Sequence, residues 1–125
     1  MRDLAIHVTH RPGEIARVAS ALGRKDVNIK SIAGMGMNTQ GIIRIIPDDI
    51  EAARTALQDA NIRFEECELA SALVENKAGE LAELASKLAN ANINIQAIYV
   101  IGLEGELVEV ALAVDDIKKA KRVLE

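Results

Sequence analysis

Two stretches of the sequence repeat one set of residue types that could bind a small polar molecule. The stretches are His10–Glu14 and Asn76–Glu80, and each is followed by an asparagine, Asn28 or Asn94. A turn that leads from a strand into a helix presents backbone N–H groups without partners, which suit a carboxylate. The glycine within each stretch lets a ligand approach the backbone, because no Cβ stands in the way. The asparagine side chain donates and accepts hydrogen bonds, so it could engage either end of a zwitterion.

This repeated set is part of a wider internal duplication. Residues 10–32 and 76–98, offset by 66 positions, are identical at nine of 23 positions. Further along, Asp48-Asp49-Ile50 corresponds to Asp115-Asp116-Ile117 at an offset of 67, which a one-residue difference in the intervening hairpin explains. The chain is therefore two copies of one unit. We predict domains at residues 1–67 and 68–125.

Hydrophobic spacing predicts the elements of the first unit. Apolar residues alternate along residues 4–8, as in a strand, and then recur at helical spacing on Ile15, Val18, Ala19 and Leu22. The β-branched stretches 27–37 and 41–47 flank turn residues, as in a hairpin. A second helix follows Asp48, its predicted N-cap, and a last strand spans residues 62–67.

The second unit repeats this order but stops early. Its predicted elements are a strand at 69–75, a helix at 78–90, strands at 93–101 and 106–114, and a helix at 115–124. The apolar pattern of the helix at 78–90 rests on Leu81, Leu84, Ala85 and Leu88. No residues remain for a fourth strand. The order predicts an α+β fold of two ferredoxin-like βαββαβ units in tandem, the second lacking its last strand, with helices on one face of antiparallel sheets.

Composition excludes several classes of protein. The chain has 15 Lys and Arg residues against 19 Asp and Glu, a net charge of −4, and Phe64 and Tyr99 are its only aromatic residues. A nucleic-acid binder needs a basic face or aromatic stacking platforms, so we expect no nucleic-acid partner. The lone Cys67 excludes an internal disulfide. The apolar runs are too short to span a membrane and residues 1–30 lack a signal-peptide pattern, so we expect a cytoplasmic protein without a membrane partner.

Other chemistries fit the sequence poorly. His7 and His10 point to opposite faces of a strand and no acidic or cysteine cluster completes a ligand set, so we expect no metal site and no cofactor. Gly34-Met35-Gly36 resembles part of a dinucleotide-binding motif but leads into a hairpin instead of a helix. An acylphosphatase-like hydrolase would need a glycine-rich phosphate loop around Arg11, and that pattern is missing. No set of catalytic residues is recognisable, so we expect no enzymatic activity.

The segments around the two glycines resemble the signature of the ACT domain. They are Thr9-His10-Arg11-Pro12-Gly13-Glu14-Ile15-Ala16 with Val27-Asn28-Ile29, and Glu75-Asn76-Lys77-Ala78-Gly79-Glu80-Leu81-Ala82 with Ile93-Asn94-Ile95. The resemblance covers essentially the whole chain and implies a non-catalytic regulatory protein that binds a small amino acid at interfaces between paired domains. The ligand-binding residues that it implies are His10, Arg11, Gly13, Asn28, Asn76, Lys77, Gly79 and Asn94.

Three alternatives stay open. The two glycines could serve turn geometry alone, and the two asparagines could satisfy polar groups at strand edges. Each unit also departs from the ACT signature at one position: His10 replaces an amide in the first unit, and Ala78 replaces a proline in the second.

The third alternative concerns the function. It is a regulatory subunit that acts in trans on an amino-acid biosynthetic enzyme such as acetolactate synthase.

The sequence also predicts contacts between copies of the chain. The strands at 93–101 and 106–114 are apolar on both faces, which predicts an oligomer, most simply a homodimer. Because the second unit has no fourth strand, one side of the strand at 69–75 needs a cover. We expect this cover to come from the first unit or from a second copy, and we favour the second copy.

Overall fold

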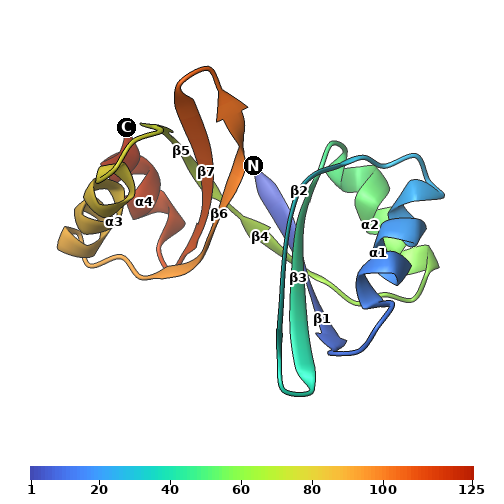
Figure 1. Cartoon of the computed structure of the whole chain (residues 1–125). Helices are drawn as coiled ribbons and strands as arrows, with labels where there is room; N and C mark the ends of the chain where they lie inside the picture. Colours follow the sequence, from blue (N-terminus) through green and yellow to red (C-terminus); the bar gives the residue numbers. More distant parts are fainter. The chain divides into compact units, whose positions relative to one another are not determined.

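The computed structural model describes all 125 residues. They form two compact units, Arg2–Cys67 and Glu68–Glu125, and Met1 associates with the second of these. In each unit two helices cover one face of a sheet (Figure 1). This arrangement confirms the predicted α+β class.

The first unit has the complete ferredoxin-like order. Its elements are β1 (Arg2–Thr9), α1 (Glu14–Gly23), β2 (Ile29–Met37), β3 (Gln40–Pro47), α2 (Ile50–Asp59) and β4 (Glu65–Glu68). The strands lie in the order β2-β3-β1-β4, and β3 pairs antiparallel with both β1 and β2. The last strand is thus shorter and later than the predicted 62–67.

The second unit repeats the order with three strands. Its elements are β5 (Ala70–Glu75), α3 (Glu80–Asn90), β6 (Ile95–Glu104), β7 (Leu107–Val114) and α4 (Ile117–Leu124). The strands lie in the order β5-β7-β6, and both pairs are antiparallel. The fourth strand is absent from this unit, as predicted.

Each unit has a core of its own between helices and sheet. Strand residues such as Ile6 and Leu112 meet helix residues such as Leu22 and Leu88 there, and all four are almost completely buried. Val27, which the sequence analysis placed in a strand, is instead a buried residue in the loop before β2. Apolar β-branched residues that anchor loops in the core therefore explain why some strands begin later than predicted.

The duplicated Asp-Asp pair has one structural role per aspartate. Asp49 is the N-cap of α2, where its carboxylate accepts from the Ala52 N–H at 3.1 Å, so the predicted cap at Asp48 was wrong. Asp48 instead accepts from the Asn28 N–H at 3.1 Å, and its own N–H donates to the Asn28 carbonyl. The first aspartate thus ties the start of β2 to the end of β3, while the second starts a helix.

The second unit reproduces both roles. Asp116 caps α4 by accepting from the Lys119 N–H at 3.1 Å, and Asp115 accepts from the Asn94 N–H at 3.0 Å. The backbone of each site asparagine is therefore a structural anchor. Its side chain, which is exposed in both units, remains available.

A bulge accounts for the change of offset from 66 to 67. Gly34 of β2 pairs with Ile43, and Val100 of β6 pairs with Val110. The next partners are Met35 in β2 but Gly102 in β6, so Ile101 is the additional residue. A bulge of this kind leaves one residue without a partner and bends the strand.

Strand β5 is an edge strand within the chain. It pairs with β7 along its whole length, from Ala70 opposite Leu112 to Glu75 opposite Leu107. No strand lies on its other side. Cover of this edge by the first unit stays a prediction. Pairing with a second copy stays a prediction.

We predict that the two helix caps contribute equally to stability. Asp49→Ala and Asp116→Ala should each lower the free energy of unfolding by about 1 kcal/mol, because one N–H of the first turn loses its acceptor. Urea denaturation followed by circular dichroism measures this. Equal stability of either variant and the parent chain would contradict the assignment.

Candidate functional site

The helices are too short to cover the helix-facing side of their sheets. α1 and α3 have 10 and 11 residues, about 15 Å, whereas β2 and β6 have 9 and 10 residues, about 30 Å. Ile98 and Val100 pair with the core residues Leu112 and Val110, so they face the helices. Yet their exposed fractions are 40% and 55%, and that of Leu103, nearer the hairpin turn, is 72%. Part of each sheet is thus open beside the start of a helix.

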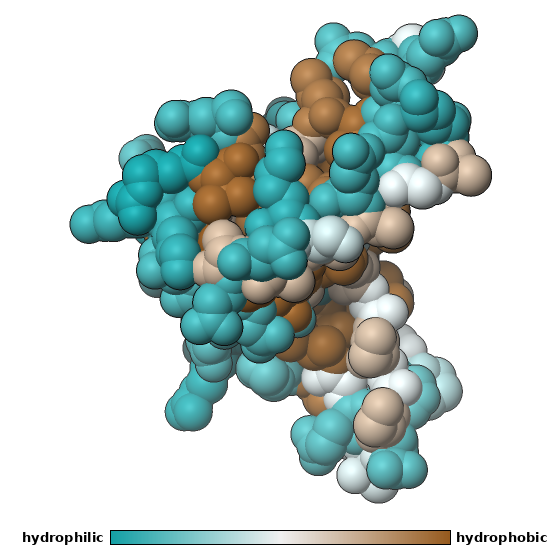
Figure 2. Space-filling model, turned by 90° about the vertical axis from the view of Figure 1, so that its left-hand side faces the viewer, coloured by the Kyte–Doolittle hydropathy of each residue, from teal (hydrophilic) through white to brown (hydrophobic).

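The first apolar residue of each of these helices faces this open region. Ile15 and Leu81 are 53% and 56% exposed, although both fall on the apolar face predicted for their helix. Both residues instead line cavities next to the helix start. In Figure 2, hydrophobic patches reach the surface among hydrophilic side chains on the side of the molecule that carries α3 and α4. Exposed apolar surface framed by polar groups is typical of a binding site.

The first cavity has a volume of about 430 Å³. Its walls are the β1–α1 turn, which contains His10, Arg11 and Gly13, and the first residues of α1. Its floor is the hairpin of β2 and β3, where three glycines at positions 34, 36 and 41 keep the surface flat. Three of the four site residues predicted in this unit therefore lie together.

Gly36 makes room for the His10 ring. A Cβ built on Gly36 would lie 2.4 Å from Cε1 and Nδ1 of His10, closer than atoms can approach. The ring therefore rests on the bare backbone of β2. This gives the Gly-Met-Gly stretch a packing role. In the second unit Leu103 occupies the position of Gly36, because Leu103 pairs with Val108 as Gly36 pairs with Gly41.

A buried carboxylate stands at the start of α1. Glu14 is only 7% exposed, and Arg11 and Arg17 donate to its two oxygens at 3.1 and 2.9 Å. The hydrogen bond from Arg17 is the main cause that holds the pKa of Glu14 below its ordinary value of 4.5, against the opposing effect of burial. The sequence analysis missed this cluster, although Arg17 follows Glu14 by three residues, which is the spacing of neighbours on a helix.

The second cavity has a volume of about 270 Å³ and lies at the start of α3, as the first lies at the start of α1, but different side chains line it. Its floor is aliphatic and includes Val100 and Val110, and its wall includes Asn76, Lys77 and Glu80. Lys77 contacts carboxylates on both sides, at 2.9 Å for Glu75 and 3.5 Å for Glu80. These contacts, with that of Glu75 first, raise the pKa of Lys77.

The charged groups of the two cavities differ. In the first unit Arg11 and Arg17 both pair with Glu14, whereas Glu83 takes the place of Arg17 in the second unit. The second cavity has one lysine for two acidic side chains, Glu75 and Glu80, at its wall. It therefore offers acceptors to a cationic group, which the first cavity does not.

Backbone conformation alone explains the two turn glycines. Gly13 and Gly79 are the N-caps of α1 and α3, with φ angles of +94° and +90°. Such angles strain any residue with a Cβ. No side chain caps either helix, and no atom lies within 4 Å of a Cβ built on either glycine. The turn requires glycine, and it also leaves the helix start open to a ligand.

Asn28 and Asn94 do not join these cavities. Each lies after the end of its helix, next to the first residue of β2 or β6. Gly13 and Gly79 are at the other end of the same helices, about 15 Å away. Within one unit the predicted turn residues and the predicted asparagine are therefore separated, and their shared role in binding stays a prediction.

Two other features of the chain can be reported directly. No three His, Cys, Asp or Glu side chains are grouped so that they could hold a metal ion. None of the helices is both long and apolar enough to cross a membrane.

We predict that Gly36→Ala moves the His10 ring off β2. The expected result is a change in the NMR shifts of the His10 ring protons with little loss of stability, because an exposed ring can rotate away. Gly102→Ala is the control, since a Cβ at Gly102 meets no atom within 4 Å. Unchanged His10 shifts in Gly36→Ala would contradict the packing.

We predict that Glu14 makes the fold sensitive to acid. A carboxyl group whose pKa falls on folding stabilises the folded state above its unfolded pKa, and this contribution disappears as the pH falls. The free energy of unfolding should therefore fall below about pH 4.5, and less so in Glu14→Gln. Urea denaturation at pH values from about 3 to about 7 measures this pH dependence of the free energy of unfolding. The same pH dependence in both proteins would contradict it.

Comparison with known proteins places this geometry in a family. The whole chain, residues 1–125, matches the family described as an ACT domain pair. No curated protein matches the sequence. Among solved structures, a protein of Bacteroides thetaiotaomicron is similar with a TM-score of 0.88 and 21% identity, over 98% of this chain and 85% of that one.

Two further solved structures share the fold at low sequence identity. One is the ligand-free regulatory subunit of aspartate kinase from Thermus thermophilus, with a TM-score of 0.66 and 19% identity over 98% of this chain and 88% of that one. The other contains aspartokinase alpha and beta subunits, with a TM-score of 0.67 and 20% identity over the same shares. The match over all 125 residues confirms the resemblance to the ACT signature, and the chain belongs to the ACT domain pair family.

Proposed function

We propose that the protein is a non-catalytic regulatory protein that senses a small amino acid at the starts of α1 and α3. The observation that carries this proposal is the repeated junction of an uncapped helix start with an open apolar floor. The N–H groups of the first helical turn attract a carboxylate. The floor accommodates an apolar side chain.

The second cavity suits a zwitterion better than the first. The N–H groups at the start of α3 take the carboxylate. Glu75 and Glu80 share a single lysine, Lys77, so their excess negative charge attracts the ammonium group. Asn76 supplies both a donor and an acceptor beside them. The aliphatic floor at Val100 favours a small apolar side chain over a charged one. In the first cavity the arginines already satisfy Glu14, so no carboxylate is left for the ammonium group.

Asn28 and Asn94 complete a site only from another domain. Each lies about one helix length from the turn of its own unit, so it reaches a ligand when a second ACT domain presents it. This requirement supports a homodimer in which domains of two copies lie side by side. The exposed Ile15, Leu81 and Val100 give such an interface its apolar area.

The alternative is a regulatory subunit that acts in trans on a biosynthetic enzyme. The regulatory subunit of aspartate kinase, which shares the fold, supports this class of function. Co-purification of a separate enzyme with the chain would favour it. Binding of an amino acid by the isolated chain favours the sensor.

We predict that Asn76→Ala weakens binding of the best amino-acid ligand by about 1–3 kcal/mol, because a buried group of the ligand loses its hydrogen-bond partner. Asn94→Ala should reduce the binding free energy by a similar amount if Asn94 reaches the ligand from the second copy. The ligand is first found by a thermal-shift screen of the amino acids, and affinities are then measured by calorimetry.

Asn90→Ala is the control for these variants. Asn90 is an exposed asparagine at the end of α3, away from both cavities, and its loss should leave the affinity unchanged. Equal affinity in Asn76→Ala and Asn90→Ala would contradict the site. Failure of every amino acid to bind at millimolar concentration would contradict the sensor.

A further inference from the structure

Glu14 at the first cavity is paired with two arginines, one more than its charge requires. Arg17 is its main partner, because the hydrogen bond from Arg17 is the largest cause of the lowered pKa of this carboxyl group. Arg11 reaches the same carboxylate through Nε alone, at 3.1 Å, and its side chain is 66% exposed. Of the two arginines, only Arg11 lines the cavity. Its Nη groups therefore keep their donors for an anion at this wall.

A planar group already rests on the floor of this cavity. Three atoms of the His10 ring, Cγ, Nδ1 and Cε1, all lie within 2.8 Å of the position that a Cβ on Gly36 would take. A ring that approached with its edge would bring only one or two atoms so close. The imidazole therefore turns its face to β2, and the bare backbone there accepts the face of a ring.

The floor beside the His10 ring is open. Gly34 pairs with the core residue Ile43, so it faces the helices as Gly36 does. The atom nearest to a Cβ built on Gly34 is Cδ1 of Ile15, at 3.6 Å. Apolar side chains, among them Val8 and Ile15, line the cavity around this floor. A volume of about 430 Å³ with mostly apolar walls and few charged groups is typical of a small-molecule site.

We propose that the first cavity binds a planar aromatic carboxylate that has no ammonium group. The aromatic ring lies on the glycine floor beside His10, and the Nη groups of Arg11 bind the carboxylate. An ammonium group would meet the positive charge of Arg11 without an acceptor, because the arginines already satisfy Glu14. This inference rests on the proposed role of the α1 start as a ligand site, and it assigns to that site a ligand class other than an amino acid.

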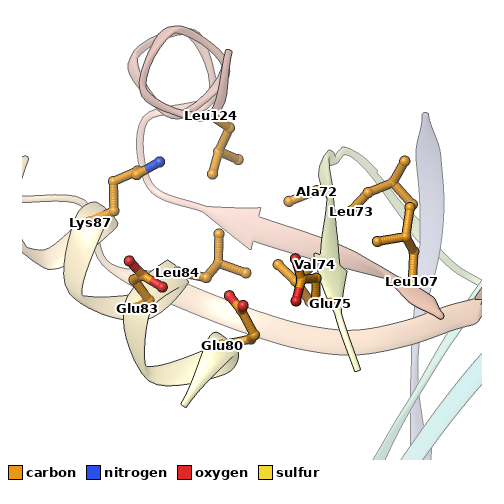
Figure 3. A pocket seen from close by; sticks show the side chains of 10 residues that line it. All are labelled: Ala72, Leu73, Val74, Glu75, Glu80, Glu83, Leu84, Lys87, Leu107 and Leu124. Atoms are coloured by element: carbon orange, nitrogen blue, oxygen red, sulfur yellow. The ribbon is translucent and has the colours of Figure 1, made fainter. Parts of the chain in front are cut away.

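The second unit disfavours such an acid. At the start of α3, Glu75 and Glu80 share the single Lys77. A larger groove of this unit, of about 470 Å³, is bordered by the carboxylates of Glu75, Glu80 and Glu83 and by Lys87 (Figure 3). These carboxylates repel an anion that brings no ammonium group to offset its charge. The charges of the two units therefore direct a simple carboxylate to the first cavity.

Benzoate tests the proposal when the backbone amide signals of the isotope-labelled full chain are followed. It should shift the signals of residues 10–16 and 34–36 to saturation and leave those of residues 79–82 in place. Cyclohexanecarboxylate has the charge without the planar ring, and phenylalanine adds an ammonium group. Each should bind at residues 10–16 at least about fivefold more weakly than benzoate. Equal affinity of either compound would overturn the ligand class, and the absence of saturable shifts with millimolar benzoate would overturn the site.

Two variants with matched controls test the residues. Arg11→Gln should weaken benzoate at least about tenfold, because the charged donors are lost, whereas Arg24→Gln, at the exposed end of α1, should not. Gly34→Ala should also weaken it at least about tenfold by filling the floor, yet it should fold, since the added methyl group meets Ile15 at an ordinary contact distance. Gly102→Ala in β6 is its control. Unchanged affinity in Arg11→Gln or in Gly34→Ala would overturn the proposal.

The same titrations separate this inference from the proposed amino-acid sensor. If an amino acid shifts residues 79–82 while benzoate shifts no signal, the inference is overturned and the sensor stands. If benzoate saturates the signals of residues 10–16 while no amino acid binds, the inference is supported and the sensor is contradicted.

Discussion

The structure depends on a mismatch of lengths. A helix rises about 1.5 Å per residue and a strand about 3.3 Å, so helices and strands of about ten residues cannot cover one another. Beside the start of α1 and α3, the helix-facing side of each sheet stays open. The left-handed glycine before each helix has no side chain, so no side chain caps the first turn beside this opening. The cavities thus follow from how the elements are built.

The two copies of the unit keep this geometry and change its chemistry. In the first, His10 rests on Gly36 and arginines neutralise Glu14. In the second, leucine replaces that glycine, asparagine replaces the histidine, and acidic groups outnumber the lysine. The paired aspartates that anchor β2 and β6 are retained in both. The chain thus carries one frame with two cavities of different chemistry, and the proposed amino-acid ligand fits the second cavity better than the first.

The order of the elements could be predicted from the sequence because both copies of the repeated unit show the same pattern of apolar residues. The boundaries could not, because Val27 and Ile62 look like strand residues but anchor loops in the cores. Ile15 and Leu81 fit a helix face, yet only the relative lengths of helix and strand decide that they stay exposed. His10, Arg11 and Gly13 line the first cavity and Asn76 and Lys77 line the second, while their role in binding stays a prediction. The separation of Asn28 and Asn94 from the turn glycines could have been predicted, because a helix of about ten residues, about 15 Å long, lies between each glycine and its asparagine.

The most direct test of the account is a titration of the isotope-labelled protein with amino acids, followed by the backbone amide signals of the two helix starts. A ligand carboxylate held by the N–H groups of α3 should shift the signals of residues 79–82 most, and those of residues 13–16 less. Saturation of these shifts by one small apolar amino acid is the expected result. Shifts that spare residues 79–82, or no shift with any amino acid at millimolar concentration, would contradict the account.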